Sequence, residues 1–234
     1  MYRLLTFDAV GTLFRARGSV GSIYASAARD LGFVREAGAF RDAFRSAFAA
    51  MPPLAFPGAS EHEIRACERA WWADLVGRVL DLVAAPSGFD RGRYFDRVYT
   101  VFASAKGWEL YDDVLQALDA VAAAGLRMGI VSNFDARCRA VCEALGIARY
   151  FQDFTLSSEA GVAKPDPGIF AAALRAHGVR AGEAVHVGDH PILDVMAARA
   201  LGMKGVLVDR RDGTVTPGGV TRITSLAELS RHVG

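Results

Sequence analysis

Near its start the chain reads Leu4-Leu5-Thr6-Phe7-Asp8-Ala9-Val10-Gly11-Thr12-Leu13-Phe14. This apolar run ends on one carboxylate, Asp8, and breaks at once into a Gly-Thr turn. Such a run predicts a buried strand of a parallel sheet. Open α/β sheets bind their ligands just outside the carboxyl ends of the strands, so Asp8 is the first candidate for a functional residue.

The composition excludes several classes of protein. The chain has 234 residues, is 52% hydrophobic and carries a net charge of +1, so we expect no nucleic-acid partner. The sequence contains no apolar run of the ~18 residues that span a membrane, and its start lacks the pattern of a signal peptide. The cysteines, Cys67, Cys138 and Cys142, match no metal or disulfide spacing. We therefore expect a cytoplasmic protein without a membrane partner.

Residues 16–105 differ in character from the rest of the chain. Alanine, phenylalanine, arginine and glutamate recur there at helical spacing, which predicts a block of helices. Ser60 and Glu63 have the spacing of a capping box, so one helix should begin at this point. Trp71 and Trp72 are expected to pack inside this helical block.

From Trp108 onward, predicted strands and helices alternate. Together with the first strand, the apolar runs at 126–131, 153–157, 184–187 and 205–208 predict a sheet of about five strands. This alternation is typical of an α/β fold with a doubly wound parallel sheet. The expected organisation is a core domain of residues 1–15 and 106–234, with residues 16–105 inserted as a helical cap domain.

Four groups of polar residues fall at the carboxyl ends of the predicted strands or just beyond them. They are Asp8, the pair Ser132-Asn133, Lys164 in Lys164-Pro165-Asp166-Pro167, and Gly188-Asp189 followed by Asp194. A parallel sheet brings these ends to one edge, so we expect the groups to meet in a single crevice.

This combination fits the chemical demands of phosphoryl transfer. A carboxylate nucleophile such as Asp8 divides a difficult hydrolysis into two easier steps. Asp8, Asp189 and Asp194 offer the hard oxygen ligands that Mg²⁺ prefers. A serine hydroxyl at position 132 suits a phosphate oxygen, and Lys164 can neutralise charge on the transferring group.

The order of these motifs resembles the haloacid dehalogenase (HAD) superfamily over the whole chain, and most closely the branch of HAD-like hydrolase domain-containing protein 3. The first family motif is Asp-x-Asp-x-Thr, and the others are a strand ending in Ser or Thr, a Lys, and Gly-Asp followed by a second Asp. The corresponding positions here are Asp8, Val10 and Thr12, then Ser132, then Lys164, and finally Gly188, Asp189 and Asp194.

The resemblance implies a role for each matched residue. Asp8 would be the catalytic nucleophile, and Lys164 would steady the phospho-aspartate and bind substrate. Phosphate would also be bound by Thr12, Ser132 and Asn133. Mg²⁺ would be held by Asp8, by Asp189 and by the main-chain carbonyl of Val10, with the help of Asp194. The implied fold is a Rossmann-like core with a type-1 helical cap that closes over a small phosphorylated substrate.

Val10 departs from the family pattern. Phosphatases of the family have an aspartate there that protonates the leaving group and then activates water, and such help is worth ~10²–10⁴-fold in rate. The sequence therefore predicts a Mg²⁺-dependent hydrolase that is slow or limited to good leaving groups, such as acyl or aryl phosphates.

Three alternatives remain. A 2-haloacid dehalogenase needs no proton for its halide, but family dehalogenases need no metal and typically lack the Gly-Asp pair. A phosphonoacetaldehyde hydrolase also lacks the second aspartate, but it uses a cap lysine, and residues 16–105 contain none. The last alternative is a non-catalytic module that binds a phosphoryl ligand.

Several nearby residues have two interpretations. His190 is either a substitute proton carrier or a loop histidine, and His186 is expected to be a core residue with its polar atoms paired. Arg15 and Arg17 either face an anionic substrate or lie on the surface at a hinge. The sequence leaves open whether the protein is a monomer or a homodimer.

Overall fold

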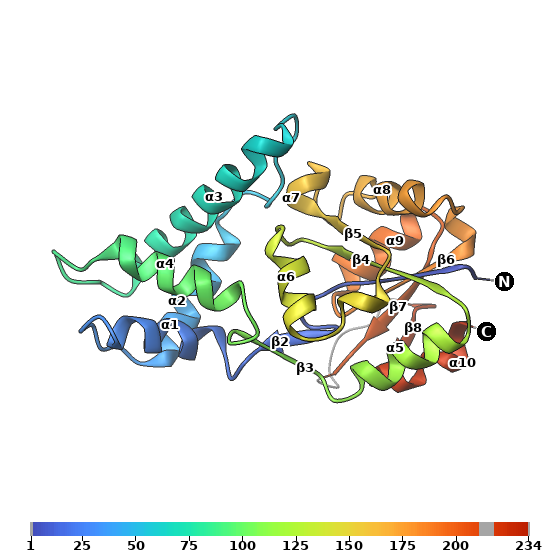
Figure 1. Cartoon of the computed structure of the whole chain (residues 1–234), viewed down its shortest axis with the longest axis horizontal. Helices are drawn as coiled ribbons and strands as arrows, with labels where there is room; N and C mark the ends of the chain where they lie inside the picture. The colour runs from blue at the N-terminus through green and yellow to red at the C-terminus, as the bar shows by residue number, and fades with distance from the viewer. Residues whose placement is uncertain (1, 211–217, 234) are drawn as a thin grey trace.

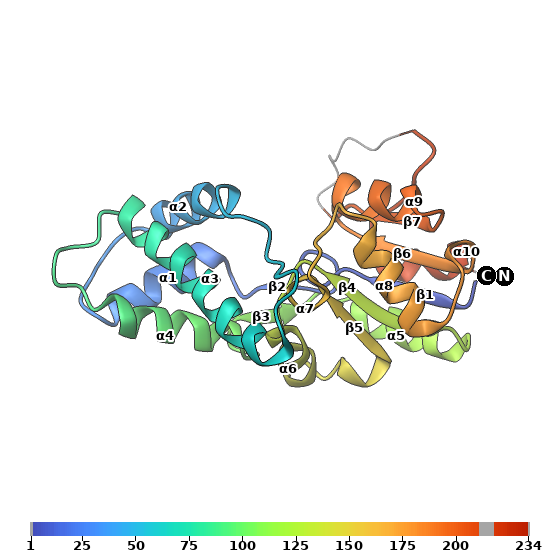
Figure 2. The same cartoon turned by 90° about the horizontal axis from the view of Figure 1, so that it is seen from above.

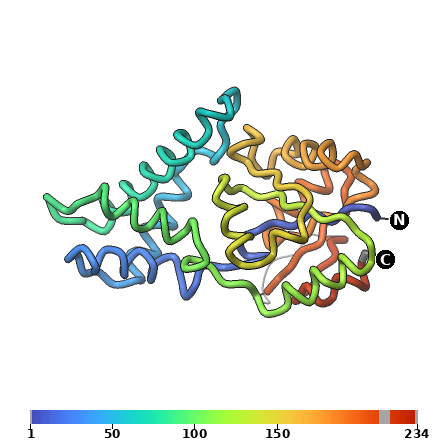
Figure 3. The backbone as a smooth tube through the Cα atoms, viewed as in Figure 1, coloured from blue at the N-terminus to red at the C-terminus, as the bar shows by residue number. Residues whose placement is uncertain are grey.

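The computed structural model describes residues 2–210 and 218–233. The chain forms an α/β lobe, at the right of Figure 1, and a separate helical lobe at the left. Figure 3 shows that the chain leaves the α/β lobe early, builds the helical lobe, and returns once.

A parallel sheet forms the centre of the α/β lobe. In the described part of the chain it has six strands in the order β5-β4-β1-β6-β7-β8. The strands are β1 (Leu4–Phe7), β4 (Arg127–Ser132), β5 (Asp153–Leu156), β6 (Ala184–Gly188), β7 (Lys204–Val208) and β8 (Thr221–Ile223). The expectation of five strands was one too few, because the three-residue edge strand β8 is too short and polar to form an apolar run.

The central strand β1 is covered on both faces. Leu5 and Phe7 pack with helices α5 (Val114–Ala123) and α6 (Arg137–Ala144) on one face. Leu4 packs with α8 (Gly168–His177) and α9 (Ala197–Ala200) on the other face. Because side chains alternate along a strand, this double burial requires the nearly continuous apolar run seen in the sequence. The predicted doubly wound parallel sheet is confirmed.

The remaining short helices connect these elements. They are η1 (Ala148–Tyr150), α7 (Ser157–Ala160), η2 (Ala181–Glu183), η3 (Pro191–Met196), η4 (Leu226–Glu228) and α10 (Ser230–Val233). The helical segment after β6 is divided into the π-helix η3 and the α-helix α9. The division arises because the carbonyl of His190 accepts hydrogen bonds from both Asp194 N and Val195 N, which widens the turn.

Helices α1 to α4 form the helical lobe and have a core of their own. They are α1 (Val20–Arg29), α2 (Ala37–Ala49), α3 (Glu61–Leu82) and α4 (Arg91–Phe102). Phe40, Leu75 and Tyr94 are fully buried between them. The capping box of Ser60 and Glu63 is present at the start of α3. None of the helices within residues 2–210 and 218–233 has the length and apolar character of a membrane span.

An antiparallel pair of short strands, β2 (Phe14–Ala16) and β3 (Trp108–Leu110), joins the two lobes. Arg15 Nε donates to Glu109 Oε1 across this pair at 2.8 Å, and Arg17 Nη2 donates to the carbonyl of Trp108. Both arginines therefore pair within the hinge. Three-residue strands leave too weak a pattern to be predicted from sequence. The exact domain boundaries, at residues 16 and 105, remain a prediction.

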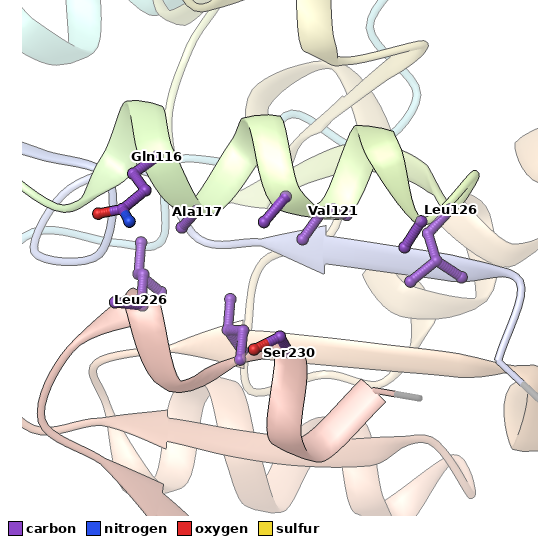
Figure 4. A pocket seen from close by; sticks show the side chains of 10 residues that line it. Gln116, Ala117, Val121, Leu126, Leu226 and Ser230 are labelled. Carbon is purple, nitrogen blue, oxygen red and sulfur yellow. The ribbon is translucent and has the colours of Figure 1, made fainter.

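A cavity of about 250 Å³ lies between α5 and the C-terminal helices. Figure 4 shows its apolar lining, which includes Val121 and Leu126 from one side and Leu226 from the other. It shares no lining residue with the polar cavity at the strand ends.

Candidate active site

The polar groups expected to meet at the strand ends do lie together. Asp8 follows β1, Ser132 ends β4, Asp189 follows β6, and Lys164 lies in the connection from α7 to α8. The views in Figures 1 and 2 place these elements side by side at the end of the sheet nearest the helical lobe. They enclose a cavity of about 180 Å³ lined by Asp8, Val10, Ser132, Asn133, Lys164, Asp189, His190, Leu193 and Asp194.

Asp8 is held through one of its carboxylate oxygens. Its Oδ1 atom accepts hydrogen bonds from Ser132 Oγ at 3.0 Å and from Lys164 Nζ at 2.6 Å. Burial raises the pKa of Asp8, and the positive charge of Lys164 opposes that rise. No described residue donates a hydrogen bond to the second oxygen, Oδ2. One oxygen thus orients the carboxylate while the other stays available for a metal ion or for attack.

Lys164 lies between two carboxylates. Its Nζ atom is 2.6 Å from Asp8 Oδ1 and 2.6 Å from Asp194 Oδ1, and its side chain is buried. Burial alone would lower the pKa of Lys164, but Asp194 and Asp8 raise it above the usual value. Lys164 therefore stays charged at neutral pH, and its charge acts in a site largely withdrawn from water.

Asp194 has partners at both carboxylate oxygens. Besides Lys164, its Oδ1 atom faces His186 Nε2 at 3.3 Å, and its Oδ2 atom accepts from the backbone N–H of His190 at 2.9 Å. Burial would raise the pKa of Asp194, but Lys164 and His186 hold it below its usual value. These contacts indicate that Asp194 orients Lys164 and stays ionised.

His186 is a fully buried residue of β6 with both ring nitrogens paired. Its Nδ1 atom lies 2.9 Å from Thr6 Oγ1 on the adjacent strand β1, and Nε2 faces Asp194. Burial lowers its pKa, so the ring is neutral at pH 7 and supports Asp194 through a hydrogen bond.

Asp189 differs from the other two aspartates because, in the described part of the chain, no side chain donates a hydrogen bond to it. Burial and the nearby charges of Asp8 and Asp194 raise its pKa to about 7. Oxygen atoms of these three carboxyls lie within 4.8 Å of one another. With Lys164 as their charged neighbour, the ionised carboxyls carry an excess of negative charge. A hard divalent cation such as Mg²⁺ fits this donor set.

Two glycines permit this close arrangement. Gly11 has φ +94°, and a Cβ atom there would lie 2.3 Å from Asp189 Oδ2. A Cβ atom on Gly188 would lie 2.2 Å from Asp194 Cγ. Any larger residue at either position would displace a carboxylate of the cluster.

Val10 borders the polar cavity without contributing a charged group. Its side chain is 38% exposed, and it also lines a second, larger cavity beneath the helical lobe. The cavity's acidic lining residues within the described chain are Asp8, Asp189 and Asp194, which already form the cluster. No further carboxyl of the described residues lines the cavity beside Val10.

His190 also lines the cavity, but its ring has a structural contact. Its Nδ1 atom accepts hydrogen bonds from the backbone N–H groups of Ile192 and Leu193, each at 3.2 Å. The ring therefore caps the helix that carries Asp194. An Nδ1 that accepts hydrogen bonds places the proton of the neutral ring on Nε2.

Two of the residues expected to bind substrate have other contacts. Asn133 Nδ2 donates to the carbonyl of Lys164 at 2.9 Å, and its Oδ1 atom accepts from the Lys164 backbone N–H at 2.7 Å. Asn133 thus positions Lys164 while one amide N–H remains for a ligand. Thr12 is fully buried outside the cavity lining, and within the described residues its hydroxyl has no partner. Arg210 Nη2 donates a hydrogen bond to the carbonyl oxygen of Thr12 at 2.7 Å.

Polar contacts between the two lobes were not anticipated from the sequence. Glu68 on α3 accepts hydrogen bonds from the Ala136 backbone N–H at 3.1 Å and from Ser158 Oγ at 2.7 Å. The neighbouring Trp72 donates its indole N–H to Asp135 Oδ2 at 2.5 Å. One signal was available, because Glu68 shares the buried face of α3 with Ile64 and Leu75.

Arg137 completes this contact between the lobes. Its guanidinium makes several hydrogen bonds to Asp135, and both side chains are buried. It also lies over the rings of Trp72 and Tyr99 from the helical lobe, 4.7 Å and 4.0 Å from their centres. The helical lobe is thus held over the strand ends by a buried polar cluster of Glu68, Trp72, Asp135, Arg137 and Ser158.

The α/β lobe thus carries three carboxyl groups and a lysine at its strand ends, next to the helical lobe. The chain belongs to the haloacid dehalogenase-like hydrolases, because the model of that family matches residues 2–202. The resemblance seen in the sequence motifs is confirmed.

Individual relatives agree with this assignment. The haloacid dehalogenase-like hydrolase domain-containing protein 3 of Danio rerio is 33% identical over 214 residues, which cover 92% of this chain and 88% of the relative. The phosphoserine phosphatase of Thermus thermophilus is 32% identical over 142 residues, which cover 60% and 57% of the two chains.

Solved structures show the same fold. A defluorinating L-2-haloacid dehalogenase superposes with a TM-score of 0.80 at 20% identity, covering 99% of this chain and 95% of the other. A relative by sequence is thus named as a phosphatase, and a protein with the same fold is named as a dehalogenase.

Proposed function

We propose that this protein is a Mg²⁺-dependent hydrolase of small phosphorylated molecules whose leaving groups need no proton. The observation that carries the proposal is the joint geometry of Asp8, Lys164 and Asp189. The buried carboxylate of Asp8 lies beside a charged lysine and near a carboxyl, Asp189, to which no described side chain donates a hydrogen bond. If these residues only formed a surface ion pair or capped a helix, they would not need to be buried together in this arrangement.

In the proposed reaction the free oxygen of Asp8 attacks phosphorus, and the bond from phosphorus to the leaving oxygen breaks. Lys164 neutralises charge on the phosphoryl group, and Ser132 keeps Asp8 oriented. Water then attacks the aspartyl-phosphate, the bond to Asp8 breaks, and the phosphate takes up the proton of the water. The remaining N–H of Asn133 is suited to a phosphoryl oxygen.

Asp8, Asp189 and the carbonyl of Val10 are the proposed metal ligands, with Asp194 beside them. When bound, Mg²⁺ would reduce repulsion between the Asp8 carboxylate and the anionic substrate. The excess of acidic groups in the cluster supports this assignment.

Val10 determines which substrates are expected to react quickly. Its side chain can neither protonate a leaving oxygen nor activate water. An alkoxide is a strong base and leaves slowly without a proton, whereas an acyl or aryl oxide leaves as a stable anion. We therefore expect kcat/KM for acetyl phosphate or phenyl phosphate to exceed that for an alkyl phosphate by ~10²-fold or more.

The proposal is tested by phosphate release from acyl, aryl and alkyl phosphates, with Mg²⁺ and with a chelator. Asp8→Asn is the control, since it keeps the shape of the side chain and removes the nucleophile. The proposal requires Mg²⁺-dependent turnover by the wild type that Asp8→Asn lacks. If the wild type gives no turnover above Asp8→Asn but binds phosphate analogues, the protein is a binding module instead.

A dehalogenase is the second candidate, and Val10 is the observation that favours it, because a halide leaves without a proton. The cluster of Asp8, Asp189 and Asp194 argues for phosphoryl chemistry. Chloride release from 2-chloropropionate without metal would establish the dehalogenase and exclude the phosphatase.

A further inference from the structure

A second cavity adjoins the proposed active site under the helical lobe. It measures about 350 Å³ and meets the polar cavity at Val10 and Asn133, which line both. Its walls come from both lobes and from the hinge, including α2, α3 and the strand β3, which Figure 2 shows to the left of the parallel sheet. Its size lies in the range of small-molecule sites. We call it the aromatic chamber.

The chamber is lined mainly by rings. Phe44 and Phe48 stack on α2 with their centres 5.5 Å apart. Trp72, Phe102, Trp108 and Phe134 extend the apolar wall. Phe48 remains 47% exposed and Val10 38% exposed, so apolar surface of the lining residues stays uncovered. Uncovered apolar surface in a pocket favours an apolar ligand group.

The polar groups of the lining are mostly paired with residues behind the wall or with the backbone. Arg15 faces Glu109, and Arg137 faces Asp135. The indole N–H groups of Trp72 and Trp108 donate to Asp135 and to the carbonyl of Phe102. A sugar or amino-acid leaving group would lose its hydrogen bonds to water and find few replacements here, which is a strong penalty. A neutral ring meets no such penalty.

Tyr24 supplies one exception. Its ring lines the chamber, and its hydroxyl has no hydrogen-bond partner in the described part of the chain. A single polar substituent on a bound ring can therefore be accommodated.

We propose that the aromatic chamber binds the leaving group, and that the preferred substrates are phosphate esters or anhydrides of a neutral aromatic group. This inference rests on the proposed function and specifies its substrate class. The phosphoryl group would occupy the polar cavity at Asp8, and the bond that breaks would lie near Val10. The phosphoryl group passes to Asp8, and the aryl oxide or the aromatic carboxylate departs as an anion with the bonding electron pair.

The aromatic chamber and the valine at position 10 favour the same kind of leaving group. An aromatic oxide is a weaker base than an alkoxide, so it needs no acid at position 10. Val10 also continues the apolar lining toward the phosphoryl site, where an aspartate would place a charge against the ring. The valine therefore suits the binding of an aromatic group as well as its departure.

The test compares two phosphonates that cannot be hydrolysed, benzylphosphonate and ethylphosphonate. Each binds through the same phosphoryl end, and they differ by a ring. Calorimetric titration of the full chain with Mg²⁺ present should give a dissociation constant about tenfold or more lower for benzylphosphonate, because the ring buries apolar surface. Equal constants for the two would overturn the inference while leaving the proposed function intact.

Phe48→Ala tests the location of the ring. Phe48 is half-exposed, so its truncation should leave the fold intact. The variant should lose most of the preference for benzylphosphonate and keep the affinity for ethylphosphonate. It should also raise KM for phenyl phosphate more than KM for acetyl phosphate.

Leu82→Ala is the matched control, because Leu82 is an exposed apolar residue of the same lobe outside the chamber. Leu82→Ala should change neither the affinities for the two phosphonates nor the KM values for phenyl phosphate and acetyl phosphate. An unchanged benzyl preference in Phe48→Ala would contradict the proposed location. If neither phosphonate binds, the proposed phosphoryl site at Asp8 is wrong. The proposal that the aromatic chamber binds the leaving group is then wrong as well.

Discussion

Gly11 and Asp189 lie so close together that no side chain fits between them. A Cβ atom on Gly11 would lie 2.3 Å from Asp189 Oδ2, and Gly11 adopts φ +94°. The turn after β1 therefore packs directly on a carboxyl that we propose as a metal ligand. This contact joins the sequence motif that contains Asp8 to the motif that contains Asp189.

We predict that Gly11→Ala weakens Mg²⁺ binding by about tenfold or more, because the methyl group displaces the Asp189 carboxylate. The positive φ should also destabilise the fold by about 1–2 kcal/mol. Calorimetric Mg²⁺ titration and thermal unfolding would measure both effects. Gly58→Ala is the control, since Gly58 has φ +81° and open space around its Cβ position. It should lose similar stability and keep the Mg²⁺ affinity, and a similar loss of affinity would contradict the prediction.

We predict that Val10→Asp raises kcat/KM for an alkyl phosphate by about 10²-fold or more, because the new carboxyl can protonate the alkoxide. The gain for an aryl phosphate should be much smaller, since its leaving group needs no proton. Val10→Asn has the same shape as Val10→Asp without the acid and should give no gain. Phosphate release from paired alkyl and aryl esters measures the difference. An equal gain for both esters would show that position 10 acts through binding.

We predict that Mg²⁺ affinity rises with pH up to about pH 7 and levels off above it. The metal binds ionised Asp189, whose pKa of about 7 means that binding must release a proton at lower pH. The affinity should fall about tenfold per pH unit well below pH 7. Calorimetry in buffers of different ionisation enthalpy measures the released proton. Proton release that is the same at pH 6 and pH 8 would contradict the prediction.

The same carboxyl should make the metal-free protein less stable as the pH rises. The pKa of Asp189 is raised in the folded state and about 3.9 in the unfolded chain, so between about pH 4 and pH 7 the unfolded chain binds fewer protons. The free energy of unfolding should therefore fall across this window by on the order of a few kcal/mol. Asp189→Asn should remove this slope, and urea unfolding at several pH values would measure it.

We predict that Trp72→Phe loosens the contact between the lobes. The change keeps a ring against Arg137 but removes the N–H that donates to buried Asp135. The unfolding free energy should drop by about 1–3 kcal/mol. Hydrogen exchange of the Ala136 and Arg137 amides should become faster, because the lobes separate more often. Trp71→Phe is a matched control, since the Trp71 indole N–H donates within the helical lobe to Pro52. Equal exchange at these amides in both variants would refute the role of Trp72.

Much of the fold follows from local patterns in the sequence. The apolar run at Leu4–Phe7 predicts a strand covered on both faces, and it forms the centre of the sheet. The capping box of Ser60 and Glu63 marks a helix start that the structure contains. Elements with weak local signals could not be predicted, such as β8 and the hinge pair of β2 and β3, because three residues carry too little periodicity.

The sequence by itself determined which chemical groups this protein has and where Val10 departs from the family pattern, because motif spacing is local. The tertiary structure alone decided how those groups share their partners. It pairs Lys164 with both Asp8 and Asp194, and it joins the polar cavity to the aromatic chamber at Val10. Among the described residues it gives Asp189 no side-chain donor. These relationships depend on distances between segments far apart in the chain, and only the packing of the sheet and the helical lobe sets those distances.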